Sequence, residues 1–222
     1  MLDALGQILP MAIVVALSPM PIIAVVLMLV SAKARVNGPM FVIGWLVGMA
    51  VVGGIVLVAA GPEASDSGDP ATWVAYVELA IGVLLLLLAV KQWRARPAEG
   101  MEVEMPKWMA AVDSFTPLKS AGFAAFFGGV NPKNLLLILA AASTIAQTGI
   151  SGGEQAIVYG VFCLIGTLGV AIPVIVYFAL GDRAPALLRR MQMWMAHNNA
   201  AIMSVLLLVI GVKIFGDGLS AL

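Results

Sequence analysis

Six apolar stretches divide the chain, and each is long enough to cross a lipid bilayer. They cover residues 4–30, 39–60, 72–91, 121–146, 154–180 and 198–218. A transmembrane α-helix needs about 20 mostly apolar residues. Soluble domains carry about 25% charged residues, whereas this chain carries 11%. The sequence therefore predicts an all-α integral membrane protein of six transmembrane helices, with too little remaining chain for a soluble catalytic domain.

The basic residues predict how these helices are oriented. Ten of the twelve Lys and Arg residues lie in alternate connections, namely Lys33, Arg35, Lys91, Arg94, Arg96, Lys107, Lys119, Arg183, Arg189 and Arg190. The intervening connections, residues 61–71 and 147–153, contain none. Because short cytoplasmic loops carry an excess of Lys and Arg, we expect a multi-pass protein of the cell (inner) membrane with both termini outside the cytoplasm.

The chain divides into two halves joined by a linker. Residues 1–93 and 121–222 each hold three spans, and residues 94–120 form the cytoplasmic linker. Apolar residues recur in the linker at helical spacing, at Met105, Trp108, Met109, Val112 and Phe115. This spacing predicts an amphipathic helix lying on the membrane surface.

The two halves resemble each other locally. Residues 17–22 align with 130–135, the Gly-rich segment 44–54 aligns with 160–169, and residues 87–91 align with 209–213. Because each half has an odd number of spans, the second half would be inverted relative to the first, as in many secondary transporters. The alternative is chance similarity between apolar helices.

A proline interrupts the middle of the first and the fourth span. Each proline follows a residue that often caps a helix, in Ser18-Pro19 and in Asn131-Pro132. A proline removes a backbone hydrogen bond and clashes with the preceding turn. We therefore expect each of these spans to be two half-helices that meet near the middle of the membrane. Pro173 is also expected to interrupt the fifth span.

The polar residues at these two breaks predict a site for an anionic group. Helix N-termini attract anions, and Lys133 adds a full positive charge that is costly to place against lipid. The candidate substrate-binding residues are Ser18, Pro19, Pro21, Asn131, Pro132, Lys133 and Asn134. In the structural alternative, the two asparagines satisfy backbone groups around a kink, and Lys133 pairs with freed carbonyl groups.

The remaining polar residues offer few other kinds of chemistry. Glu78 lies inside the third span and is a candidate for proton coupling, although it could instead pair with Lys213. The single cysteine, Cys163, excludes a disulfide or a thiolate metal cluster. We predict no catalytic residues, because no nucleophile, base and orienting group converge on one side of the membrane. We predict no metal, because the spans lack clustered Asp, Glu, His or Cys residues, and we expect no cofactor. We expect no nucleic-acid partner, because topology and anionic headgroups explain the basic loops.

Several motifs, in this order and spacing, resemble the peptidoglycolipid-addressing (sulfolipid-addressing) protein family of the lysine-exporter superfamily. They extend over nearly the whole chain and comprise Ser18-Pro19-Met20-Pro21, the loop from Ser31 through Arg35 to Asn37-Gly38, Gly44-Trp45, Pro106-Lys107-Trp108-Met109, Val130-Asn131-Pro132-Lys133-Asn134 and Gly181-Asp182-Arg183. Amino-acid exporters of the superfamily usually have glycine around the first proline pair. Ser18 and Met20 depart from that pattern, which weakens an amino-acid substrate.

The resemblance implies a membrane transporter that moves or helps deliver a glycolipid, or another anionic or sugar-bearing lipid, to the cell envelope. Its expected partners are membrane lipids and this substrate. Two other functions stay open, namely export of a small polar solute or amino acid by proton exchange, and an accessory role in a larger lipid exporter. The glycine spacing at Gly44 and Gly48 permits close helix contact within one chain or in a homodimer.

Overall fold

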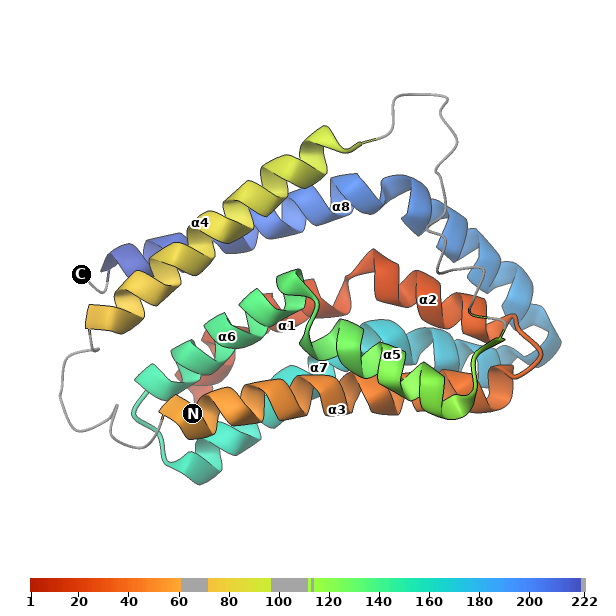
Figure 1. The fold of residues 1–222 in the computed structure, drawn as a ribbon, viewed down its shortest axis with the longest axis horizontal. Helices are drawn as coiled ribbons and strands as arrows, with labels where there is room; N and C mark the ends of the chain where they lie inside the picture. Colours follow the sequence, from red (N-terminus) through yellow and green to blue (C-terminus); the bar gives the residue numbers. More distant parts are fainter. Residues whose placement is uncertain (61–71, 97–111, 113, 221–222) are drawn as a thin grey trace.

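The computed structural model describes residues 1–60, 72–96, 112 and 114–220. The elements of this part of the chain are all helices and include no strand (Figure 1), which confirms the all-α prediction. The elements are α1 Leu2–Ala16, α2 Pro19–Leu29, α3 Ala34–Ala60, α4 Thr72–Arg94, α5 Pro117–Gly129, α6 Pro132–Gln147, α7 Gly152–Leu180, the short 3₁₀ helix η3 Gly181–Arg183, and α8 Ala184–Ser220. The expected surface helix of the linker lies largely at residues 97–111, outside the described residues.

The first and fourth apolar stretches are each broken into two helices, as predicted. The axes of α1 and α2 differ in direction by 49°, and those of α5 and α6 differ by 59°. The breaks fall at Ser18 and Asn131, and Pro19 and Pro132 each occupy the first helical position that follows. Proline suits this position because its missing N–H would have no partner inside the helix.

Length and composition indicate a membrane protein. Three helical stretches of the described chain are long and apolar enough to cross a bilayer, Ala34–Ala59, Ala75–Arg94 and Gly152–Ser220, and the number rises to five if each bent pair is one span. The expected interruption at Pro173 is wrong, because α7 continues through this residue to Leu180. One missing hydrogen bond does not end a long helix that is packed against neighbours.

Small residues bring the helices into close contact. Gly44 and Gly48 of α3 lie against the backbone of Ala121 and Ala125 in α5, where an added Cβ atom would overlap the chain. Gly169 of α7 lies in the same way against the end of α1. The spacing of Gly44 and Gly48 therefore serves a contact within one chain, because small residues allow two backbones to approach.

The helices α4 and α8 form a second layer beside the other helices (Figure 1). Gly82 of α4 lies against Phe215, and Gly218 of α8 lies against Leu79. This layer contacts the broken helices, because α8 packs on α2 and α4 packs on α6. The end of α4 and the middle of α8 are thereby brought near the two breaks.

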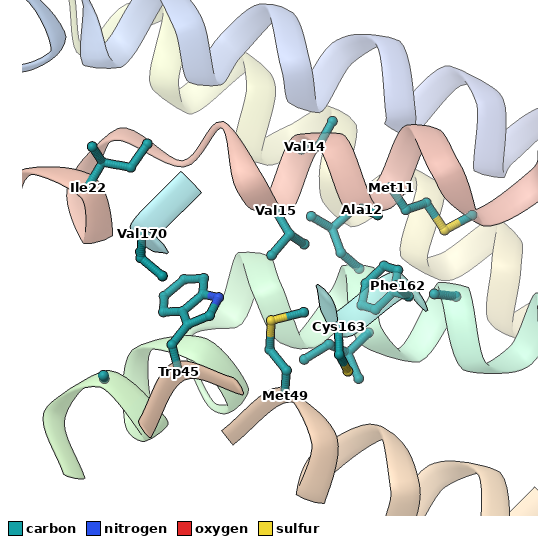
Figure 2. Packing of buried hydrophobic residues seen from close by; sticks show 14 of the residues in the cluster. Met11, Ala12, Val14, Val15, Ile22, Trp45, Met49, Phe162, Cys163 and Val170 are labelled. Carbon is teal, nitrogen blue, oxygen red and sulfur yellow. The ribbon is translucent and has the colours of Figure 1, made fainter. Parts of the chain in front are cut away.

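The apolar core extends through most of the helices, and Figure 2 shows the part of it between α1, α3 and α7. Trp45 and Met49 extend from α3 towards Val15 of α1, and Phe162 of α7 packs beside them. Trp45 Nε1 donates to the carbonyl of Gly166 at 3.3 Å. This part of the core packs α1, the helix before the first break, against α3 and α7.

Candidate functional site

Ser18 forms the first break but does not cap the second half-helix. It occupies the N-cap position of α2 with extended backbone angles, φ −68° and ψ 112°. Its hydroxyl instead donates to the carbonyl of Val15 at 2.7 Å. The expectation of a side-chain cap is therefore wrong. The hydroxyl satisfies a carbonyl at the end of α1, a local bond that serine often forms.

The asparagines of the second break satisfy backbone groups. Asn131 Oδ1 accepts the N–H of Lys133 at 3.2 Å and so caps α6. Asn134 Nδ2 donates to the carbonyl of Phe127 at 2.9 Å. Both asparagines therefore satisfy backbone groups around the break, as the structural alternative predicted. Lys133 does not, because its ammonium pairs with a hydroxyl and with no carbonyl in the part of the chain that the structure describes.

The side chain of Lys133 joins the two breaks. Its ammonium donates to the hydroxyl of Ser18, which is 115 residues away in the sequence. No other hydrogen bond or ion pair of this ammonium occurs among the described residues. An ammonium has three donors, so two of them have no protein partner there.

A cavity of about 120 Å³ lies where the two breaks meet. It contains six of the seven predicted residues together with residues from α4 and α8, and its lining is Ser18, Pro19, Met20, Pro21, Gln92, Asn131, Lys133, Asn134, Asn199 and Met203. Pro132 is the predicted residue that does not line it, because it is exposed at the start of α6. The structure thus gathers the predicted residues at one polar cavity.

Sequence reasoning missed Gln92 and Asn199, which complete the cavity. Both lie near the polar ends of apolar stretches, so their position in the sequence resembled that of ordinary interfacial residues. The Oδ1 atoms of Asn134 and Asn199 are buried and accept no hydrogen bond from the described residues. Asn134 is 1% exposed, and an unsatisfied buried acceptor costs about 1–3 kcal/mol. The cavity therefore holds a cation with one protein partner among the described residues, and two residues of its lining carry a buried acceptor.

The backbone at this cavity supplies fewer N–H donors than two helix N-termini normally do. Pro19, Pro21 and Pro132 have no N–H, and that of Lys133 is already bound to Asn131. The ammonium of Lys133 is therefore the main group there that can attract an anion.

Glu78 lies in a separate polar contact between α4 and α6. It is 5% exposed, and its Oε1 accepts from Gln147 Nε2 at 2.9 Å. Lys213 binds Asp217 at 2.6 Å instead. The expected pair of Glu78 with Lys213 is therefore wrong, because an acidic partner four residues along α8 is closer to the lysine.

A larger and mostly apolar groove runs between α3 and α7. Its volume is about 900 Å³. Apolar residues of both helices line it, including Leu46, Leu57, Val58 and Leu164, and Ser151 and Gln155 add polar groups near the start of α7. Pockets of about 300–1,000 Å³ accommodate small organic ligands. The groove is large enough for part of a lipid hydrocarbon chain.

Comparison with known proteins identifies the family to which the chain belongs. Neither the curated proteins nor the solved structures gave a match. The family model described as Sap, sulfolipid-1-addressing protein, matches residues 8–220, which include both breaks and the whole lining of the polar cavity. The chain therefore belongs to the sulfolipid-1-addressing protein family.

Proposed function

We propose that this protein moves, or helps to deliver, an anionic or sugar-bearing lipid such as a glycolipid from the cytoplasmic side of the membrane to the cell envelope. The family points to lipid addressing. The cavity between the two breaks would hold the polar headgroup, with Lys133 as its main anion-binding group. Ser18, Pro19, Pro21, Asn131 and Asn134 would shape the rest of the site.

One observation carries this proposal. The ammonium of Lys133 lies in a polar cavity between two broken helices, and its single described partner is the neutral hydroxyl of Ser18. A positive charge inside a membrane protein is energetically costly, and a charged residue at such a position usually marks a functional site. An anionic headgroup could replace or join Ser18 and supply the missing negative charge.

The groove between α3 and α7 favours a lipid over a small polar solute. A transporter of polar solutes has no need for about 900 Å³ of mostly apolar groove. A lipid has hydrocarbon chains that must stay in an apolar environment while its headgroup crosses. The groove and the cavity together match a substrate with both parts.

We further propose six spans in two inverted three-helix repeats, as in the lysine-exporter superfamily. The merged stretch Gly152–Ser220 is 69 residues long, about 100 Å of helix, which exceeds the roughly 30 Å hydrocarbon core. Gly181, with a φ of 51°, lies where the chain turns back between α7 and α8 (Figure 1). The packing of α3 on α5 and of α7 on α1 is what two equivalent halves would give.

The proposed orientation places both termini outside the cytoplasm. Figure 1 shows the two termini at the end of the molecule where α3 and α6 finish and α7 begins. The connections that hold Lys33, Arg35 and Arg183 lie at the opposite end. This separation supports the orientation predicted from the basic loops.

Glu78 is the candidate residue for proton coupling, whether the transported substrate is a lipid or a small solute. Its buried carboxylate holds Gln147 near the end of α6, the helix that begins beside Lys133. Protonation of Glu78 would change this contact. A purely accessory role and a homodimer remain alternatives to autonomous transport by a single chain.

The test is lipid movement by the purified protein in liposomes. A fluorescent anionic lipid is followed by the fraction that dithionite reduces from outside. We expect Lys133→Met to slow movement about tenfold or more, the effect of losing one hydrogen bond to a charged group. Lys119→Met is the matched control, because Lys119 is exposed and lies outside the cavity.

Two results would contradict the proposal. Undiminished movement of the anionic lipid by Lys133→Met would exclude the anion site. No movement by the wild-type protein, together with copurification of a larger exporter, would favour the accessory role.

A further inference from the structure

A second groove, separate from the proposed substrate path, lies between α4 and α8. Its volume is about 360 Å³, and its lining is Ala89, Val90, Trp93, Arg94, Ser204, Val205 and Leu208. None of these residues lines the polar cavity or the groove between α3 and α7. The groove therefore needs an explanation of its own.

The shape of this groove suits the upper part of a hydrocarbon chain. Its exposed apolar side chains are 48–53% accessible, and they are Val90, Trp93, Val205 and Leu208. From Ala89 to Arg94 the lining covers five residue steps of α4, about 7.5 Å along the helix axis. This length corresponds to the part of a lipid chain nearest to its headgroup.

Arg94 is the cationic residue in the lining of this apolar groove, at the end of α4. Arg94 lies in the last turn of α4 and makes no ion pair with any described residue. The neighbouring Arg96 is occupied differently, because its guanidinium lies 3.1 Å from the centre of the Trp93 ring and its Nε donates to the Trp93 carbonyl at 3.1 Å. Of these two guanidinium groups, that of Arg94 is the one that lines the groove and has no ion pair among the described residues.

We propose that this groove binds an anionic glycerophospholipid of the surrounding membrane, with its phosphate on Arg94 and the start of one acyl chain between α4 and α8. Basic pockets between transmembrane helices on the cytoplasmic side bind anionic headgroups. Arginine binds phosphate through two parallel hydrogen bonds. Trp93 provides the aromatic ring that commonly lies at headgroup depth. The bound lipid would hold α4 and α8 together, beside the polar cavity that both helices complete.

The test compares phosphatidylglycerol with phosphatidylcholine of the same acyl chains, titrated into the full-length protein in detergent and counted by native mass spectrometry. We expect tighter binding of phosphatidylglycerol as a one-to-one adduct. Arg94→Gln should weaken this binding about fivefold, the effect of one basic residue at an anionic membrane surface. Arg183→Gln is the matched control, because Arg183 is exposed and does not line the groove.

A second pair of variants tests the groove without removing a charge. Val205→Trp should fill the groove from an exposed position and abolish the adduct of both lipids. Val212→Trp, also exposed at 57% but outside the lining, should leave both adducts intact. Circular dichroism and gel filtration show whether each variant is folded.

Three results would overturn the proposal. They are equal affinity for the two lipids, an Arg94→Gln variant that binds like wild type, and a lipid adduct that survives Val205→Trp. A dimer that Val205→Trp disrupts, without any lipid adduct, would assign the groove to a second copy of the chain. Because Arg94 and Val205 line neither the polar cavity nor the groove between α3 and α7, failure here leaves the proposed transport function untouched.

Discussion

Replacing Lys133 with methionine should separate a transport role from a structural role, because the two roles predict opposite changes in stability. If Lys133 has a structural role, it holds the two breaks together through its hydrogen bond to Ser18. Its loss would then loosen the fold. In a transport site, the lysine is kept in spite of its cost, and its loss should leave the fold as stable or more stable.

The magnitude follows from the contacts of Lys133. The variant loses one hydrogen bond between an ammonium and a hydroxyl, worth about 1.5–3 kcal/mol. It also removes a charge whose placement in the centre of a transmembrane helix costs about 2.5–3.5 kcal/mol. The hydroxyl of Ser18 keeps its bond to Val15 at 2.7 Å, so no donor is left unpaired. We expect a net change between a loss of about 0.5 kcal/mol and a gain of about 2 kcal/mol.

The assay is reversible unfolding of the purified protein in mild detergent, with Lys119→Met as the control for loss of one lysine. The transport explanation requires that Lys133→Met unfolds at the same denaturant concentration as wild type, or a higher one, while lipid movement is lost. A decrease in the free energy of unfolding by more than about 2 kcal/mol would refute it. Lys133 would then be a structural fastener.

Two further predictions concern the packing around the site. Gly44→Ala should lower the free energy of unfolding by about 1–3 kcal/mol, because the new methyl group overlaps the backbone of Ala121. The control Gly54→Ala should not lower it, because nothing lies within 4 Å of the added atom. Equal effects of the two variants in a thermal unfolding assay would show that α3 and α5 are not in close contact. Glu78→Leu should lower the free energy of unfolding by about 1–3 kcal/mol, because it leaves Gln147 without its partner. Glu78→Gln should stay within about 1 kcal/mol of wild type. If chemical unfolding shows Glu78→Gln to be the less stable variant, the contact between Glu78 and Gln147 is contradicted.

The sequence predicted the breaks and most of the cavity because local chemistry determines them. Ser18 and Asn131 each precede a proline, and this pair can end one helix and begin another wherever it occurs. Lys133 directly follows Pro132, so it lies at the second break wherever that helix is packed. Tertiary packing was needed only to bring the two breaks together.

The remaining parts of the site depend on how distant helices pack, which local patterns do not reveal. Gln92 and Asn199 reach the cavity because α4 and α8 lie beside the broken helices. The partner of Glu78 could not be read from the spans either, since Gln147 belongs to another helix. The pair of Lys213 with Asp217 could have been predicted, because residues four apart on a helix are neighbours.

The central claim is that the cavity between the two breaks holds the negatively charged part of the substrate. Electron cryomicroscopy of the protein in nanodiscs that contain the anionic lipid would test it most directly. We predict headgroup density about 2.7–3.2 Å from Lys133 Nζ, with the ammonium turned from Ser18 towards that group. Headgroup density found only elsewhere, with Lys133 still bound to Ser18 alone, would contradict the claim.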